Sequence, residues 1–134
     1  MRNMIEQVER LYAVMDYWDG ACLGVVDFEG RPHAFRRLFD LVTDDWSDTY
    51  LLKLLNAGEF EAVMQDWEIW LRWRAAYDAG SATIETHPAL PEDAEVHARL
   101  VDTVAEAVHV PDDSEIMITS RFAKDSVIWT RLER

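Results

Sequence analysis

The chain of 134 residues contains one cysteine, two lysines and no long apolar run. The single thiol, Cys22, cannot form an intrachain disulfide, and no basic segment followed by an apolar stretch and a cleavage site argues for secretion. Because charges recur throughout, no window approaches the roughly 18 apolar residues of a membrane-spanning helix. We therefore expect a cytoplasmic protein with no membrane partner, in which Cys22 is a small buried side chain.

The sequence also lacks the motifs of common enzyme and cofactor sites. It contains no glycine-rich phosphate loop, no paired cysteines two residues apart, no zinc-protease helix and no serine-histidine-aspartate order. We predict no cofactor and no metal site on this basis. The absence of these motifs weakens the prediction of an enzyme but does not exclude one.

Positive charge is scarce as well, since 26 acidic residues against 13 lysines and arginines give a net charge of −13. Phosphate backbones would be repelled, so we predict that nucleic acid is not a partner. An acidic surface prefers a cationic partner, although negative charge can also serve solubility alone. Eleven of the cations are arginines, whose planar fork suits fixed pairing with carboxylates.

Turn chemistry and alternating side chains predict most of an antiparallel sheet. Glu29-Gly30 is expected to join strands 22–28 and 31–39, which places Val26 opposite His33 and Gly24 opposite Phe35. Both faces of this hairpin carry apolar residues, which indicates an interior position in the sheet or a second contact on its back. A strand is also expected over 48–55, and a hairpin over 115–123 and 126–133. Residues 4–15 are ambiguous between helix and strand, and we favour a short helical turn before a strand at 11–17.

Two helices are predicted between these strands. Asn56 and Glu59 have the spacing of a capping box, and Gly80 suits a helix end, so the first helix should run over 57–79. Pro91 suits the first turn of a second helix over 91–108. Residues 81–91 form a connection with one expected short strand. The sequence thus predicts a single α+β domain over 1–134, with an antiparallel sheet of about five or six strands and two main helices.

The helix over 57–79 contains three of the six tryptophans. Stepping 100° per residue gives one apolar stripe centred on Trp67, expected to be core: Phe60, Val63, Met64, Trp67, Trp70 and Leu71. Ile69 and Trp73 lie off this stripe, so either another segment such as Thr86–Pro91 covers them or they contact a partner. Arg74 lies in the stripe, where it could form a structural pair or line a cleft that holds an anion.

Aspartates flank tryptophans in two loops. Asp16, Trp18 and Asp19 occupy the first loop, and Asp44, Asp45, Trp46 and Asp48 the second. If the two loops meet at one end of the sheet, they form an acidic, aromatic-walled pocket suited to a cation or a sugar, or to acid/base chemistry with His33. The alternative is that the acids form turns and the indoles belong to the core.

Two residues of the second helix form a further candidate. Asp93 and His97 are four residues apart, so the carboxylate could orient the imidazole for base catalysis, or the pair could join His87 in a metal site. The alternative is a core histidine satisfied by a neighbour and an acid that stabilises the helix N-terminus.

These patterns lead to one principal hypothesis, a small acidic interaction module of the inhibitor or immunity type that binds a basic protein surface. A small hydrolase or ligand-binding domain is the second hypothesis, and a homo-oligomeric structural protein is the third. The candidate binding residues are Trp18, Asp19, His33, Trp46, Asp48, Ile69, Trp73 and Arg74.

Overall fold

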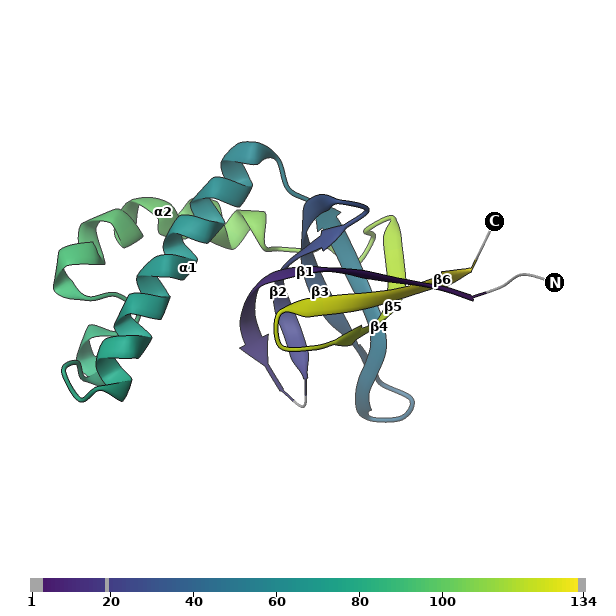
Figure 1. The fold of residues 1–134 in the computed structure, drawn as a ribbon, viewed down its shortest axis with the longest axis horizontal. Coiled ribbons are helices and arrows are strands. Elements are labelled where there is room, and N and C mark those ends of the chain that lie inside the picture. The colour runs from purple at the N-terminus through teal and green to yellow at the C-terminus, as the bar shows by residue number, and fades with distance from the viewer. Residues whose placement is uncertain (1–3, 19, 133–134) are drawn as a thin grey trace. The chain divides into compact units, whose positions relative to one another are not determined.

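The computed structural model describes residues 4–18 and 20–132, and within them the chain forms six strands and two α-helices (Figure 1). In chain order these are β1 (Met4–Tyr17), β2 (Ala21–Phe28), β3 (Arg31–Asp40), β4 (Asp45–Leu54), α1 (Ala57–Asp78), α2 (Ala94–Ala107), β5 (Ile116–Phe122) and β6 (Ser126–Leu132). The predicted α+β class, with an antiparallel sheet and two main helices, is confirmed. Neither helix in this part of the chain combines the length and apolar character that crossing a bilayer requires.

The chain divides into two compact units. The first, Met1–Asn56 with Val108–Arg134, contains all six strands and is called the barrel unit below. The second, Ala57–Ala107, contains both helices and is called the helical unit. That the whole chain is one domain stays a prediction.

In the barrel unit the six strands close into an antiparallel barrel in sequence order. β1 closes it by pairing with two partners, since Leu11 lies opposite Val26 of β2 and Glu6 lies opposite Thr130 of β6. The expected helical turn before residue 11 is therefore wrong. The backbone groups of residues 4–10 pair with β6, more than a hundred residues away. A local sequence pattern cannot reveal a partner so distant in the chain.

The predicted β2–β3 hairpin is confirmed in its register, with Gly24 opposite Phe35 and Val26 opposite His33. A side chain at Gly24 would not fit, because a Cβ there would collide with the carbonyl oxygen of Ala13. Both faces of the hairpin are buried, as the pattern indicated, since Val25 on the back is as inaccessible as Val26 on the front. The front face joins a core cluster of Ala21, Val26, Phe35, Tyr50, Leu52, Ile118, Val127 and Trp129.

In the helical unit, α1 and α2 pack against each other and are joined by a connection with two short 3-10 turns, Ile84–Thr86 and Pro91–Asp93. The strand expected in this connection is wrong. Its backbone bonds are local, as when the N–H of His87 donates to the carbonyl of Ile84. In addition, a closed barrel offers no free edge for another strand.

The buried face of α1 differs from the predicted stripe. Ile69 and Trp73 are buried, with Trp73 only 3% exposed, whereas Trp67 and Trp70 are half-buried and Leu71 is 43% exposed. The connection covers Trp73, whose indole N–H donates to Thr86 Oγ1 at 3.0 Å. Of the two alternatives that the sequence left open, covering by another segment is the one observed for Trp73. The burial of Ile69 and Trp73 corrects their assignment as contact residues. Apolar residues lie around most of α1, so their period alone did not identify the face that packs.

Candidate functional site

The β1–β2 and β3–β4 turns lie at the same end of the barrel unit, and Arg37 of β3 joins them (Figure 1). Its Nε donates to the carbonyl of Ser47 at 2.7 Å, and one terminal nitrogen donates to the carbonyl of Trp18 at 3.4 Å. The other terminal nitrogen lies 3.9 Å from Asp48 Oδ1. The guanidinium also lies 5.8 Å from the centre of the Trp46 ring. One largely buried arginine therefore fixes both turns relative to each other.

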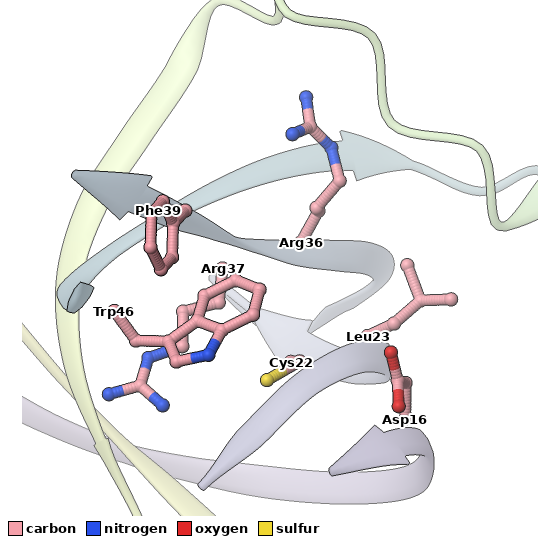
Figure 2. A pocket seen from close by; sticks show the side chains of 7 residues that line it. All are labelled: Asp16, Cys22, Leu23, Arg36, Arg37, Phe39 and Trp46. Atoms are coloured by element: carbon pink, nitrogen blue, oxygen red, sulfur yellow. The ribbon is translucent and has the colours of Figure 1, made fainter. Parts of the chain in front are cut away.

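A cavity of about 340 Å³ opens beside this arginine. Figure 2 shows its lining, which comprises Asp16, Cys22, Leu23, Arg36, Arg37, Phe39 and Trp46. The Phe39 and Trp46 rings meet edge to face, with centroids 5.2 Å apart. The Asp16 carboxylate and Leu23 lie on the side of the cavity away from Trp46, and Cys22 lies between them. The cavity therefore has an aromatic wall, an apolar floor and one acidic side.

Large apolar side chains around this cavity are exposed. We call them the barrel-end surface, and they are Tyr17, Trp18, Phe39, Leu41 and Val42. The exposed fractions are 69% for Trp18, 86% for Leu41 and 95% for Val42. Single exposed apolar residues are ordinary, but these five lie at the ends of β1 and β3 and on the turns that follow them, where water solvates their apolar area poorly.

Carboxylates surround the barrel-end surface, and some of them shape the turns. Asp40 Oδ1 accepts hydrogen bonds from the backbone N–H groups of Val42 and Thr43, at 2.8 and 3.4 Å. Asp45 Oδ1 accepts one from the N–H of Trp46 at 2.8 Å. The acids are thus turn-forming, as one sequence interpretation had it, but the neighbouring indoles are not core. Trp18 is exposed and Trp46 is half-buried.

The two arginines of the cavity lining are already engaged. Arg36 donates from Nε to the carbonyl of Val110 at 2.9 Å and from a terminal nitrogen to Asp112 Oδ1 at 2.6 Å. Its guanidinium points away from the Trp46 side of the cavity (Figure 2). Asp16, in contrast, has no side-chain hydrogen bond or ion pair with any other residue that the structure describes.

Two further side chains fix the floor of the site. Cys22 is buried, as predicted, and its thiol lies 3.4 Å from the carbonyl oxygens of Trp18 and Gly20. Tyr50 donates its hydroxyl to the carbonyl of Ala21 at 2.7 Å, and burial raises the pKa of Tyr50 to about 12. These contacts hold the start of β2 in place.

The structure places the predicted site residues in three locations. Trp18, Trp46 and Asp48 all contact Arg37 at the barrel end. Asp19 lies outside the described residues. His33 is four residues from Arg37 along β3, about 13 Å at strand spacing, and is buried with its Nδ1 2.8 Å from the carbonyl of Arg31. An acid/base role for His33 together with the two loops therefore lacks the required proximity.

Arg74 belongs to the helical unit and forms an ion pair with Asp78, one turn further along α1, at 3.1 Å. Both side chains are more than half exposed. The structural pair that the sequence offered as one alternative is therefore present, and the anion-holding cleft is not supported by this geometry.

The Asp93 and His97 side chains do not bind each other, which corrects the second candidate. Asp93 accepts two hydrogen bonds from Arg72, at 2.9 and 3.0 Å, and these bonds hold the pKa of Asp93 below its usual value. His97 Nδ1 instead lies 2.6 Å from Asp66 Oδ1 on α1. His87 packs edge-on against Trp73, with centroids 4.6 Å apart. Each group binds a neighbour that hydrophobic periodicity does not reveal.

Over residues 4–18 and 20–132, no group of three or more histidine, cysteine, aspartate or glutamate side chains is arranged to hold a metal ion. The residue that sequence reasoning missed is Arg37. Strand alternation puts it on the same face as Phe35, and a cation on an apolar face at the end of a strand was the available signal.

Comparison with known proteins gave no matching family model, no similar curated protein and no similar solved structure.

Proposed function

We propose that this chain is a cytoplasmic protein-interaction module that binds a basic partner protein through the barrel-end surface. The observation that carries the proposal is the exposure of five large apolar side chains in or next to two turns that Arg37 holds together. Leaving such a patch in water forgoes roughly 25 cal/mol for each Å² of apolar area that a partner would cover. Contact with a partner would remove this apolar area from water.

Charge supports a basic partner. Among the described residues, five aspartates lie in or beside the two turns, namely Asp16, Asp40, Asp44, Asp45 and Asp48, against two arginines in the same segments. The net charge of the whole chain is also negative, at −13. A partner with lysines and arginines around an apolar centre would be attracted at long range and complementary on contact, whereas nucleic acid would be repelled.

Rigidity of the site also supports binding. Arg37 bonds to the carbonyl groups of both turns, so the exposed side chains start from a fixed backbone. Gly20 permits this contact, because its φ of +119° favours glycine and a Cβ there would lie 2.9 Å from an Arg37 nitrogen. A preorganised surface loses less conformational entropy on association than a flexible loop does.

Site-directed photocrosslinking in the cells that express the chain tests the proposal. A benzoylphenylalanine at Leu41 should capture a basic protein, and the same residue at Ile84, which is 67% exposed in the helical unit, should not. The captured protein is then purified and its affinity measured by calorimetry. The Leu41→Ser/Val42→Ser variant should bind at least tenfold more weakly, while the control Ile84→Ser should match the wild type.

Raising the salt concentration should also weaken the wild-type complex, because the charges on both sides are screened. The proposal fails if Leu41 captures nothing, if the captured protein is acidic, or if the double variant binds as the wild type does. Crosslinks between two copies of the chain, with a dimer in sedimentation, would replace it with the homo-oligomer hypothesis.

A further inference from the structure

We infer that the cavity beside Arg37 receives one arginine side chain of the partner, with its guanidinium between the Trp46 ring and the Asp16 carboxylate. This inference rests on the proposed function and specifies the chemistry of its central contact. The cavity lining supplies the three features that an arginine side chain requires: an aromatic face, a carboxylate and an apolar passage for the methylene groups.

The aromatic wall consists of Phe39 and Trp46, held edge to face at an interplanar angle of 86°. A guanidinium lies favourably over the face of an indole, and the contact strengthens where water is excluded. Trp46 already has the Arg37 guanidinium at 5.8 Å from its ring centre. Trp46 also lines the cavity, so a cation that enters the cavity can contact the same ring (Figure 2).

Asp16 supplies the counter-charge. Its carboxylate lies at the cavity, and among the residues that the structure describes it has no hydrogen bond or ion pair. A carboxylate accepts two parallel N–H bonds from a guanidinium, a geometry that an ammonium group cannot match. An arginine is thus favoured over a lysine at this position.

The cations of the lining do not make the cavity an anion site. Arg36 is bound to Val110 and Asp112, and Arg37 to Ser47 and Trp18 with Asp48 nearby. Arg36 is paired with Asp112 and Arg37 lies 3.9 Å from Asp48, so both cations of the lining have a counter-charge, whereas Asp16 has none among the residues that the structure describes. A guanidinium therefore matches the lining better than a carboxylate or phosphate does.

The cavity is also of suitable size and character. Its volume of about 340 Å³ lies at the lower end of small-ligand pockets, which admits an extended side chain and leaves little room for a folded protein segment. Leu23 and Cys22 are apolar lining residues, against which the methylene groups of an arginine would replace water.

Titration of the full chain with Nα-acetyl-arginine amide tests the inference. The indole N–H signal of Trp46 is followed by NMR, and the buried indole of Trp129 serves as an internal control. The Trp46 signal should shift saturably with the arginine probe. The citrulline analogue, which has a similar shape and no charge, should bind at least tenfold more weakly, and the lysine analogue should also bind more weakly.

Two variants with the same change of net charge sharpen the test. Asp16→Asn should weaken binding of the arginine probe at least fivefold. Glu115→Gln, an exposed acid near the opposite end of β4, should leave it unchanged. Equal binding of arginine and citrulline, equal binding of lysine, an unaffected Asp16→Asn variant or the absence of a saturable shift would each overturn the inference.

The two proposals fail separately. If the arginine probe does not bind but Leu41→Ser/Val42→Ser still loses the captured partner, the cavity inference is wrong and the interaction surface stands. If the probe binds as expected but the double variant keeps its partner, the cavity is real and the proposed function is wrong.

Discussion

The barrel unit and the helical unit use their aromatic rings differently. In the barrel, the rings of Phe28, Phe122 and Trp129 meet edge to face inside a closed wall, and Trp129 is fully buried. On α1, Trp67 stacks on Trp70 and Trp73 stacks on Tyr77, with interplanar angles of 20° and 23°. A barrel lets rings approach from several directions, whereas one helix places residues three or four apart side by side.

This difference determines what stabilises each unit. The closed barrel removes a cluster of large side chains from water, so apolar burial dominates there. The helical unit buries fewer large side chains, Ile69 and Trp73 among them, and polar pairs add to this packing: Asp66 with His97, and Arg72 with Asp93 just before α2. Substitutions should therefore have their largest effects in the barrel interior and smaller, more specific effects in the helical unit.

The largest effect is expected for Trp129→Ala. The ring is fully buried and its indole N–H donates to the carbonyl of Asp27 at 2.8 Å. Its loss should lower the free energy of unfolding by about 3–5 kcal/mol, a large part of the stability of a small domain. Urea denaturation followed by circular dichroism measures it. A loss below about 1 kcal/mol would show that the barrel interior is not what holds this unit together.

The helical unit can be probed with a pair of tryptophans. Trp73→Ala removes a buried ring and its bond to Thr86, and should cost about 3 kcal/mol. Trp67→Ala removes a half-buried ring from a stack, and should cost about 1–2 kcal/mol. Denaturation of both variants side by side gives the order. If Trp67→Ala proves the more damaging, the predicted stripe was right and the face of α1 described above is wrong.

Gly24→Ala tests how tightly the barrel wall is packed. The added methyl group would collide with the Ala13 carbonyl and would lie 2.8 Å from the Phe35 ring, so a strand or a ring must move. We expect a loss of about 1–3 kcal/mol. Gly58→Ala, exposed in the first turn of α1, is the control and should leave stability equal or slightly higher. Equal effects at both glycines would mean that the strand of Ala13 and the ring of Phe35 move at little cost to make room for the methyl group.

The smallest effect should be a change in acid stability of the helical unit. The two bonds from Arg72 lower the pKa of Asp93, so the folded state favours the carboxylate. Their contribution is present above the ordinary aspartate pKa, near 4, and is lost as the pH falls through the lower folded value. Asp93→Asn should thus be less stable than the wild type at pH 7, with the difference shrinking as the pH falls through that lower pKa.

Helix content measured by circular dichroism across an acid titration checks this. Asp102→Asn, an exposed acid on α2, is the matched control and should behave as the wild type does. A difference between Asp93→Asn and the wild type that does not shrink as the pH falls would point to lost packing instead of the Arg72 pair.

Local patterns predicted the parts of the fold that depend on local chemistry. The Glu29-Gly30 turn sets the register of the β2–β3 hairpin, so Gly24 could be placed opposite Phe35 from sequence alone. Capping signals likewise placed α1 to within a residue of its observed bounds. In contrast, the first half of β1 depends on pairing with β6, and the buried face of α1 depends on the connection that covers Trp73. Neither partner is visible within a local window.

The candidate site shows the same limit. Aspartate–tryptophan loops could be recognised, and their meeting at one end of a sheet could be stated as a condition. The residue that brings them together, Arg37, acts through bonds to the backbone carbonyls of Ser47 and Trp18. Every residue type has a backbone carbonyl, so those contacts cannot be predicted from the identity of the residues.

The way β1 closes the barrel affects how the chain is synthesised. β1 is made first and β6 last of the six strands, and β4 ends at Leu54 while β5 begins at Ile116. At about 5–20 residues per second, the ribosome needs roughly 3–12 s to cross that interval. During it the first four strands have unpaired edges, which attract other edges. The net charge of −13 would keep nascent chains apart by repulsion until the last strand is made.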